Sequence, residues 1–334
     1  MKTLAAWANA WSHERASLVR KWSARIAASA LGVCVLAAGV EEVLERRAQT
    51  RLTAGETFAE VNGARVRYRA LGAEHTGRTI VLLPGIGASI EQMRHAQRRL
   101  AAKARTLTYD RAGYGFSVGS HAHTADDQAA ELAELLDALS VSHPVVLVGY
   151  SSSALLARVF AGRYPTRTAG LYLVEPDFPE FEEQVPGRHG PRRLYARWVL
   201  HELLVSTLGL SRLCKLGAPS SGPSGALDER EEEIFQRRRH FWALARDAYD
   251  LPTSFAQAKQ APVARVPLVI MSTEQTDPSA GLLNELYAEL ARRSPRGKVV
   301  QLPGYDHGRL FEPGPVLDAI VEGVTEMATG DAPP

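Results

Sequence analysis

The sequence has few cysteines, and they show no pattern of metal ligands. Its 334 residues contain two cysteines, Cys34 and Cys214, which lie far apart in the chain. Two isolated cysteines predict neither a disulfide framework nor a zinc site. No other motif indicates a prosthetic group, and we therefore expect no metal ion and no cofactor.

The chain also lacks an excess of charge of either sign, with 39 basic and 37 acidic residues. Such a balance creates no overall field that attracts nucleic acid, which we do not expect as a partner. Hydrophobic residues make up 45% and charged residues 23%, as is typical of globular proteins. The length allows one large core, or one core with an inserted lid. No internal repeat is present, and nothing indicates an oligomeric state.

Residues 26–40 form an uncharged run near the N-terminus. A spanning helix needs about 20 apolar residues, and this run is shorter, although Trp22 and residues 43–44 can extend it. Basic residues before it favour a cytoplasmic N-terminus and a catalytic domain on the non-cytoplasmic side: Arg15, Arg20, Lys21 and Arg25. Basic residues after it weaken that orientation: Arg46, Arg47 and Arg51.

We predict that residues 1–50 form a separate segment containing a membrane helix at about 26–44. The helix would be a single-pass anchor in contact with membrane lipid. Two alternatives are a cleaved signal peptide and an apolar helix packed on the protein. The long charged leader and the absence of a clean cleavage site disfavour the signal peptide.

From about residue 57, short apolar runs alternate with helical patterns, which predicts an α/β fold with a mostly parallel, twisted sheet flanked by helices. The predicted strands lie at 58–61, 66–71, 79–83, 106–109, 145–148, 170–174, 268–271 and 299–302. Asn62-Gly63 is a strong hairpin turn between the first two. Between 178 and 262 no buried-strand run appears, and stretches such as 193–208 and 228–249 are compatible with helices. We predict a core of 55–177 and 263–330, with a helical lid at 178–262 inserted after the sixth strand.

Residues 145–157 have the pattern of a buried strand, a tight turn and a helix start, with the sequence Gly149-Tyr150-Ser151-Ser152-Ser153 at the turn. This matches the nucleophile elbow, Gly-x-Ser-x-Gly, in which a strained turn lifts the serine hydroxyl clear of the sheet. Ser153 stands where the second glycine is usual. If Ser152 were the nucleophile, the large Tyr150 would occupy the first tight position. We therefore predict Ser151 as the nucleophile, although a serine-rich helix cap would show the same pattern.

The remaining catalytic groups are predicted from loops that follow other strands. Gly85-Ile86-Gly87 follows the third strand, and we expect the backbone N–H groups of Ile86 and Ser152 to form an oxyanion hole. His307, in the loop after the last strand, comes after the serine in chain order and is the predicted base.

The acid is predicted with open alternatives. Asp277 lies in an Asp-Pro context in the loop after the strand 268–271, and it is our first choice. Glu274 is nearer the end of that strand. Glu175 and Asp177 follow the preceding strand and are the other candidates. Each could hold the imidazole in one tautomer and stabilise its charged form.

Together these residues resemble the α/β-hydrolase superfamily, in particular bacterial serine hydrolases with an N-terminal hydrophobic segment. The similarity extends from about Glu60 to Glu326. The stretch 109–117 resembles the strand-four loop, which in that family shapes the site without taking part in the chemistry. The departures are Ser153 for glycine, Tyr150 for a frequent histidine, Asp306 for a frequent glycine, and Glu175 where aspartate is common. A serine nucleophile argues against epoxide hydrolases and haloalkane dehalogenases, which place aspartate there.

The resemblance and the residues imply a carboxylesterase-like serine hydrolase that cleaves a small-molecule acyl ester through an acyl-enzyme. The alternative is a catalytically silent protein of the same fold that binds a ligand or a partner. The Ser, His and Asp set favours the enzyme, and the altered elbow favours the alternative.

Overall fold

The computed structural model describes residues 2–119, 123–185, 192–214, 229–262, 265–273 and 279–330. Within these ranges it does not describe the side chains of residues 2–17, 19, 192–196 and 214. One eight-stranded sheet forms the centre, in the order β1-β2-β4-β3-β5-β6-β7-β8. The strands are β1 (Thr57–Val61), β2 (Ala64–Leu71), β3 (Thr79–Leu83), β4 (Arg105–Tyr109), β5 (Val145–Tyr150), β6 (Thr168–Val174), β7 (Leu268–Thr273) and β8 (Gly297–Leu302). Strands β3 to β8 run parallel to one another, and β2 is antiparallel to both of its neighbours, β1 and β4, so the predicted mostly parallel sheet is confirmed.

The antiparallel start of the sheet follows from the turn between β1 and β2. Asn62 and Gly63 both have positive φ angles, 49° and 74°. Two consecutive positive φ angles are the mark of a type I′ turn, whose twist matches that of a hairpin. The chain then crosses over between parallel strands through helices that cover both faces of the sheet.

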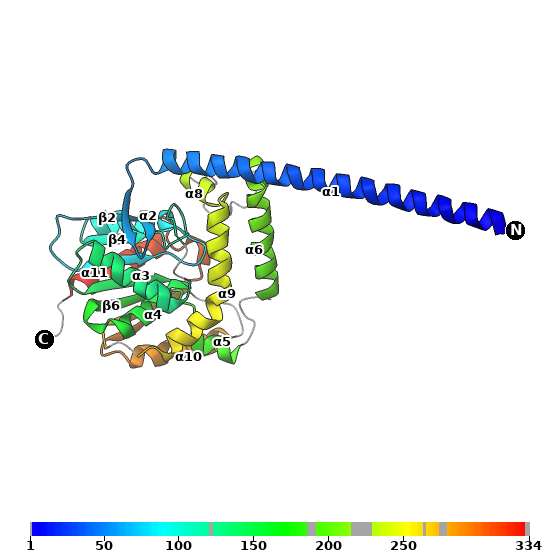
Figure 1. Ribbon diagram of the computed structural model, residues 1–334. Coiled ribbons are helices and arrows are strands. Elements are labelled where there is room, and N and C mark those ends of the chain that lie inside the picture. Colours follow the sequence, from blue (N-terminus) through cyan, green and yellow to red (C-terminus); the bar gives the residue numbers. More distant parts are fainter. Residues whose placement is uncertain are drawn as a thin grey trace.

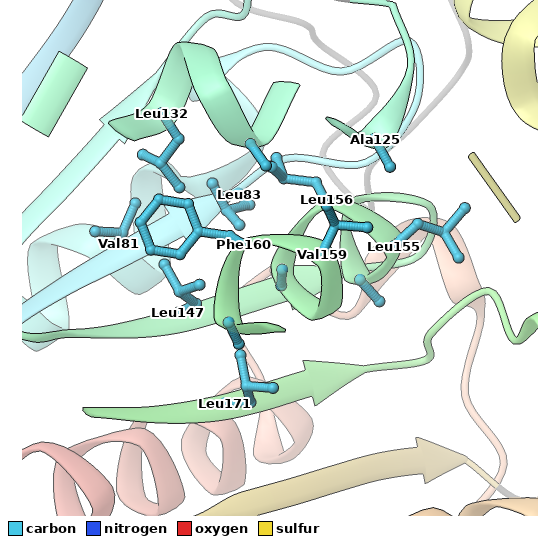
Figure 2. Close-up of a cluster of buried hydrophobic side chains, with 14 of the residues drawn as sticks. Val81, Leu83, Ala125, Leu132, Leu147, Leu155, Leu156, Val159, Phe160 and Leu171 are labelled. Atoms are coloured by element: carbon cyan, nitrogen blue, oxygen red, sulfur yellow. The ribbon is translucent and has the colours of Figure 1, made fainter. Parts of the chain in front are cut away.

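One face of the sheet carries the larger core, under α3 (Ala125–Ala138), α4 (Ser153–Arg163) and α10 (Ala280–Arg292). Figure 2 shows Phe160 of α4 among Val81, Leu147 and Leu132, which come from two strands and α3. Side chains alternate along a strand, so Val145 and Leu147 of β5 point to this face.

The other face is covered by α2 (Arg94–Ala101) and α11 (Pro315–Thr329). Val146 and Val148 of β5 point to this side and pack with Leu317 and Ile320 of α11. Because β5 is buried on both faces, its sequence is an unbroken apolar run. Three short 3-10 helices lie in the connections between these elements: η1 (Ile90–Met93), η2 (Pro165–Arg167) and η3 (His307–Arg309).

Between β6 and β7 lies a group of helices that we call the helical insertion: α5 (Pro179–Gln184), α6 (Arg192–Thr207), α7 (Leu210–Cys214), α8 (Glu229–Ile234) and α9 (Arg238–Gln260). Figure 1 shows α6 and α9 side by side at one side of the sheet. The helix-compatible stretch 228–249 is divided between α8 and α9. The break falls at Arg237, whose backbone is extended (φ −84°, ψ 125°) and whose buried guanidinium lies over the Phe116 ring.

The N-terminal helix, α1 (Lys2–Leu52), is a single continuous helix that projects far beyond the rest of the molecule (Figure 1). Its Arg20–Leu52 part is long and apolar enough to cross a membrane, since it contains an 18-residue window with a mean hydropathy of 1.8, of which 6% is buried. Signal sequences and core helices of soluble proteins can meet the same criteria of length and composition.

Candidate active site

Ser151 occupies a tight turn between β5 and α4 at the carboxyl edge of the sheet. Its φ angle is +52°, a left-handed conformation that is strained for a residue with a side chain. Gly149 allows this turn, because a Cβ there would lie 3.0 Å from the Cα of Ala154. The Ser151 N–H donates to the Val174 carbonyl at 3.0 Å and fixes the turn against β6.

Ser153, which replaces the usual second glycine, is accommodated inside the elbow. Its buried hydroxyl donates to the Leu83 carbonyl at 2.7 Å and accepts the Tyr150 N–H at 2.9 Å. The hydroxyl is thus satisfied, and it links the elbow to the end of β3. The departure therefore leaves the strand–turn–helix geometry intact.

His307 lies between the serine and a carboxylate. Its Nε2 is 3.2 Å from Ser151 Oγ, and its Nδ1 is 3.1 Å from Glu175 Oε2. The Tyr150 hydroxyl donates to the His307 carbonyl, and the two rings pack with centroids 5.0 Å apart. Asp306 caps the following turn by accepting the Gly308 N–H at 2.8 Å. The loop that presents the imidazole is therefore held from two sides.

Glu175 comes directly after β6 and has the second positive φ angle of the site, +44°. Its Oε1 accepts hydrogen bonds from Thr273, from the N–H at 2.6 Å and from the hydroxyl at 2.5 Å. Burial alone would raise the pKa of Glu175, but the hydrogen bonds from His307 and Thr273 outweigh it and lower the pKa. A carboxylate held in this way stays ionised and can stabilise an imidazolium.

The other acid candidates are placed differently. Asp277, the first choice from the sequence, and Glu274 lie outside the described residues. Asp177 lines the cavity beside Ser151, and its N–H donates to the Ser151 carbonyl at 3.1 Å. Of the candidates that the structure describes, Glu175 is the one bonded to His307.

Ile86 and Ser152, the expected oxyanion donors, flank Ser151. Ile86 follows β3 and lines the cavity with Ser151, and Ser152 is the N-cap residue of α4. In the described part of the chain, neither N–H group donates a hydrogen bond to another protein atom. Free N–H groups at a helix N-terminus can bind a developing oxyanion.

A buried network that the sequence analysis missed supports the loop containing Ile86. Arg111 donates to the carbonyls of Pro84 at 2.9 Å and Gly85 at 3.3 Å. Asp247 of α9 pairs with Arg111 at 3.4 Å and accepts the Tyr114 hydroxyl at 2.8 Å. Asp247 lies 136 positions from Arg111, and no local pattern marks the pair.

His240 of α9 provides a second support for the same loop. Its Nε2 lies 3.1 Å from the Gly87 carbonyl, and its Nδ1 accepts the Gly115 N–H at 3.4 Å. Burial, with a further effect of the Arg237 charge, lowers the pKa of His240 to about 3. The ring is therefore neutral and donates through Nε2.

A cavity of about 830 Å³ opens over Ser151 and His307, within the range of small-molecule sites. Most of its wall is apolar and comes from the helical insertion, the sheet edge and α10: Phe178, Phe181, Val199, Leu200, Leu203, Trp242, Leu251 and Leu283. Such a wall fits an acyl chain better than a charged substrate. Among the described residues, no group of three His, Cys, Asp or Glu side chains could hold a metal ion.

Comparison with known proteins adds a family match. The sequence pattern of the alpha/beta hydrolase family matches residues 80–319. The "Putative carbamate hydrolase RutD" of Pantoea ananatis is 34% identical over 110 residues, 32% of this chain and 40% of the relative. The "Pimeloyl-(acyl-carrier protein) methyl ester esterase" of Sodalis glossinidius is 35% identical over 97 residues, 29% of this chain and 36% of the relative. The matches thus cover well under half the length of these relatives.

Solved structures show the same fold at lower identity. A thermophilic esterase from Thermogutta terrifontis has a TM-score of 0.56 at 21% identity, and the match covers 83% of this chain and 100% of the esterase. A haloalkane dehalogenase variant from Bradyrhizobium elkanii has a TM-score of 0.59 at 19% identity, covering 81% and 96%.

Proposed function

The chain belongs to the alpha/beta hydrolase family, and from this membership we propose that it is a serine hydrolase that cleaves ester bonds in acyl substrates. The observation that carries the proposal is the position of His307, bonded to Ser151 on one side and to Glu175 on the other. This is the arrangement of nucleophile, base and orienting acid that acyl transfer requires.

The reaction proceeds in two steps. His307 Nε2 takes the proton of Ser151 as its Oγ attacks the substrate carbonyl, and the N–H groups of Ile86 and Ser152 bind the oxyanion. Collapse breaks the ester bond, and the alcohol leaves with the proton from His307. Water, deprotonated by the same imidazole, then attacks the acyl-serine and releases the acid with Ser151 regenerated. Glu175 stays ionised throughout and stabilises the imidazolium.

The chemistry of the site favours acyl transfer over dehalogenation. A haloalkane dehalogenase needs a carboxylate nucleophile, whereas the elbow of this chain carries Ser151. The apolar cavity supports an acyl chain as the bound group.

We further propose that residues 26–40 of α1 anchor the protein in a membrane with the catalytic domain on the non-cytoplasmic side. Their lack of charge and the low burial of α1 support this.

Labelling with a fluorophosphonate tests the proposal directly, because the reagent modifies activated serines. We expect wild type to be labelled and Ser151→Ala to be neither labelled nor active on p-nitrophenyl esters, with several orders of magnitude lost in rate. Ser152→Ala keeps its backbone N–H and serves as the matched control, which should stay labelled. A wild-type protein that resists the reagent would instead support a silent binding protein.

A further inference from the structure

The C-terminal turns of α1 belong to the globular body and not to a free stalk. Glu41 is buried and accepts Arg212 Nη2 of α7 at 3.0 Å, and Arg212 also donates to Glu233 of α8 at 2.6 Å. One turn later, Glu45 accepts the Arg238 N–H at 2.6 Å. An apolar cluster continues the contact: Ala48, Leu52, Phe116 and Ile234. The end of α1 is therefore fixed on the helical insertion.

No linker separates these contacts from the uncharged run. The run ends at Val40, and the first ion pair to the insertion begins at Glu41, within the same continuous helix. If residues 26–40 span a bilayer, the helical insertion must lie at the membrane surface. These fifteen residues rise about 22 Å, less than the hydrocarbon thickness of about 30 Å. Because the run is shorter than the hydrocarbon layer is thick, the globular body would lie directly against the lipid.

The part of the insertion beside this boundary exposes large apolar side chains, next to the exposed polar residues Arg197 and His201. Leu200 and Leu204, one turn apart on α6, are 66% and 58% exposed, and Leu213 of α7 is 79% exposed. Figure 1 shows α6 running across the axis of α1, near the point where α1 meets the body. A helix that faces water carries polar residues outward, whereas one in a membrane interface exposes leucine. Trp198, 44% exposed on α6, is of the type enriched at this boundary.

The same helix also forms a wall of the active-site cavity. Val199, Leu200 and Leu203 line it from α6, and the exposed rings of Trp242 and Tyr249 line it from α9. An acyl chain that enters between α6 and α9 would pass along these side chains toward Ser151. Leu200, which is 66% exposed, therefore belongs both to the outer surface of α6 and to the wall of the cavity.

We propose that the outer face of α6 and α7 (Leu200, Leu204 and Leu213) lies in the membrane interface, and that the cavity takes its substrate from the bilayer. The substrate class is a membrane-resident amphiphile with a long acyl chain in ester linkage. The substrate class rests on the proposed acyl hydrolase function, and the membrane contact of α6 rests on the proposed anchor at residues 26–40. The bilayer is the occupant that the structure favours, because α1 fixes this face beside the span.

Spin labelling of the full-length chain tests the membrane contact without any catalytic readout. A nitroxide is attached at Leu204→Cys in a Cys34→Ser/Cys214→Ser background, and the protein is reconstituted in phosphatidylethanolamine–phosphatidylglycerol vesicles. The matched control is Ala73→Cys, exposed after β2 at the sheet edge opposite Ser151. We expect label 204 to be relaxed by oxygen more than by a water-soluble nickel chelate, and label 73 to show the reverse. Equal nickel access at both sites would overturn the proposal. Protection of label 204 from both relaxants would also overturn it and would indicate contact with a second copy.

The double variant Leu204→Gln/Leu213→Gln tests delivery of the substrate from the bilayer. It makes the proposed membrane face polar and leaves the cavity wall unchanged, because neither residue lines the cavity. We expect turnover of a long-chain ester in vesicles to fall several-fold while turnover of a soluble short-chain ester stays at the wild-type rate. Ala73→Gln should change neither. An unchanged ratio of the two activities would overturn delivery from the bilayer. A wild-type enzyme that is inactive on both esters would refute the proposed function, and the label measurements would still decide the membrane contact.

Discussion

Glu175 is hydrogen-bonded to the imidazole of His307 from the end of β6, a strand earlier than the loop that the sequence favoured. We expect Glu175→Gln to lower kcat by up to about ten-thousand-fold, because a neutral amide cannot stabilise the imidazolium or fix its tautomer. Asp177→Asn, which changes a nearby carboxylate, is the control and should retain most activity. Steady-state kinetics of both variants and of Asp277→Asn decide the assignment. If Asp277→Asn lost most of its activity while Glu175→Gln stayed active, Asp277 would be the acid that orients His307.

The sequence predicts a single serine and a single histidine for the site but leaves the acid open among four carboxylates. Ser151 is marked by its local pattern of small residues, which the sharp turn requires. The acid is defined by which strand-end loop reaches His307, and that depends on the packing of β6 against β7. The two hydrogen bonds from Thr273 that hold Glu175 also join neighbouring strands. No spacing in the sequence reveals such a contact.

We expect the stability of the fold to depend on pH through the buried carboxyl group of Glu131. Burial raises the pKa of Glu131 from 4.5 to about 8, so between these values the folded protein keeps a proton that the unfolded chain has released. The free energy of unfolding should therefore fall as pH rises from 4.5 to 8, by up to about 1.4 kcal/mol per pH unit from this group. Chemical denaturation at several pH values should show this slope reduced in Glu131→Gln. The control is Glu134→Gln on the same helix, and equal slopes in all three proteins would refute the prediction.

At the scale of elements, the strands follow from the sequence more directly than the helical insertion does. The parallel strands β3, β5, β6 and β7 are short, largely apolar runs that are buried on both faces, whereas the edge strand β8 is partly exposed. Helix α9 depends instead on buried polar contacts with distant loops, such as His240 with Gly87 and Asp247 with Arg111. These contacts form once the insertion packs on the core. Periodicity therefore predicts helices there but not where α8 ends and α9 begins.

The contact of α9 with the loop containing Ile86 yields a prediction about Asp247. Asp247→Asn leaves the buried Arg111 guanidinium without its counter-charge, which costs about 3–5 kcal/mol when one partner of a buried pair is removed. We also expect kcat on a soluble ester to fall more than KM rises, because Arg111 holds the carbonyls of Pro84 and Gly85. Thermal unfolding and kinetics test both effects. Asp250→Asn on the same helix is the control, and the prediction fails if the two variants behave alike.

At the scale of the whole molecule, the C-terminal turns of α1 are in contact with the rest of the protein. The sequence predicted a boundary between residues 50 and 55, at the change from helical to strand-like patterns. The structure instead packs Glu41, Glu45, Ala48 and Leu52 of α1 against the body. Glu41 and Glu45, the acidic residues that follow the apolar run, thus also contact Arg212 and Arg238. The sequence shows that these acidic residues follow the apolar run, but it does not show which arginines of the helical insertion they contact.

This packing predicts where the chain can be shortened. Full-length protein should remain with membranes after a carbonate wash, and a chain beginning at Glu41 should be soluble and as active on a soluble ester as full length. A chain beginning at Thr53 loses the buried Leu52 side chain, worth about 2–5 kcal/mol, together with the ion pairs of α1. Its Tm should fall at least about 4 °C below that of the chain beginning at Glu41. Equal Tm values would show that the end of α1 does not stabilise the rest of the protein. Release of the full-length protein from membranes by the carbonate wash would show that α1 is not a membrane anchor.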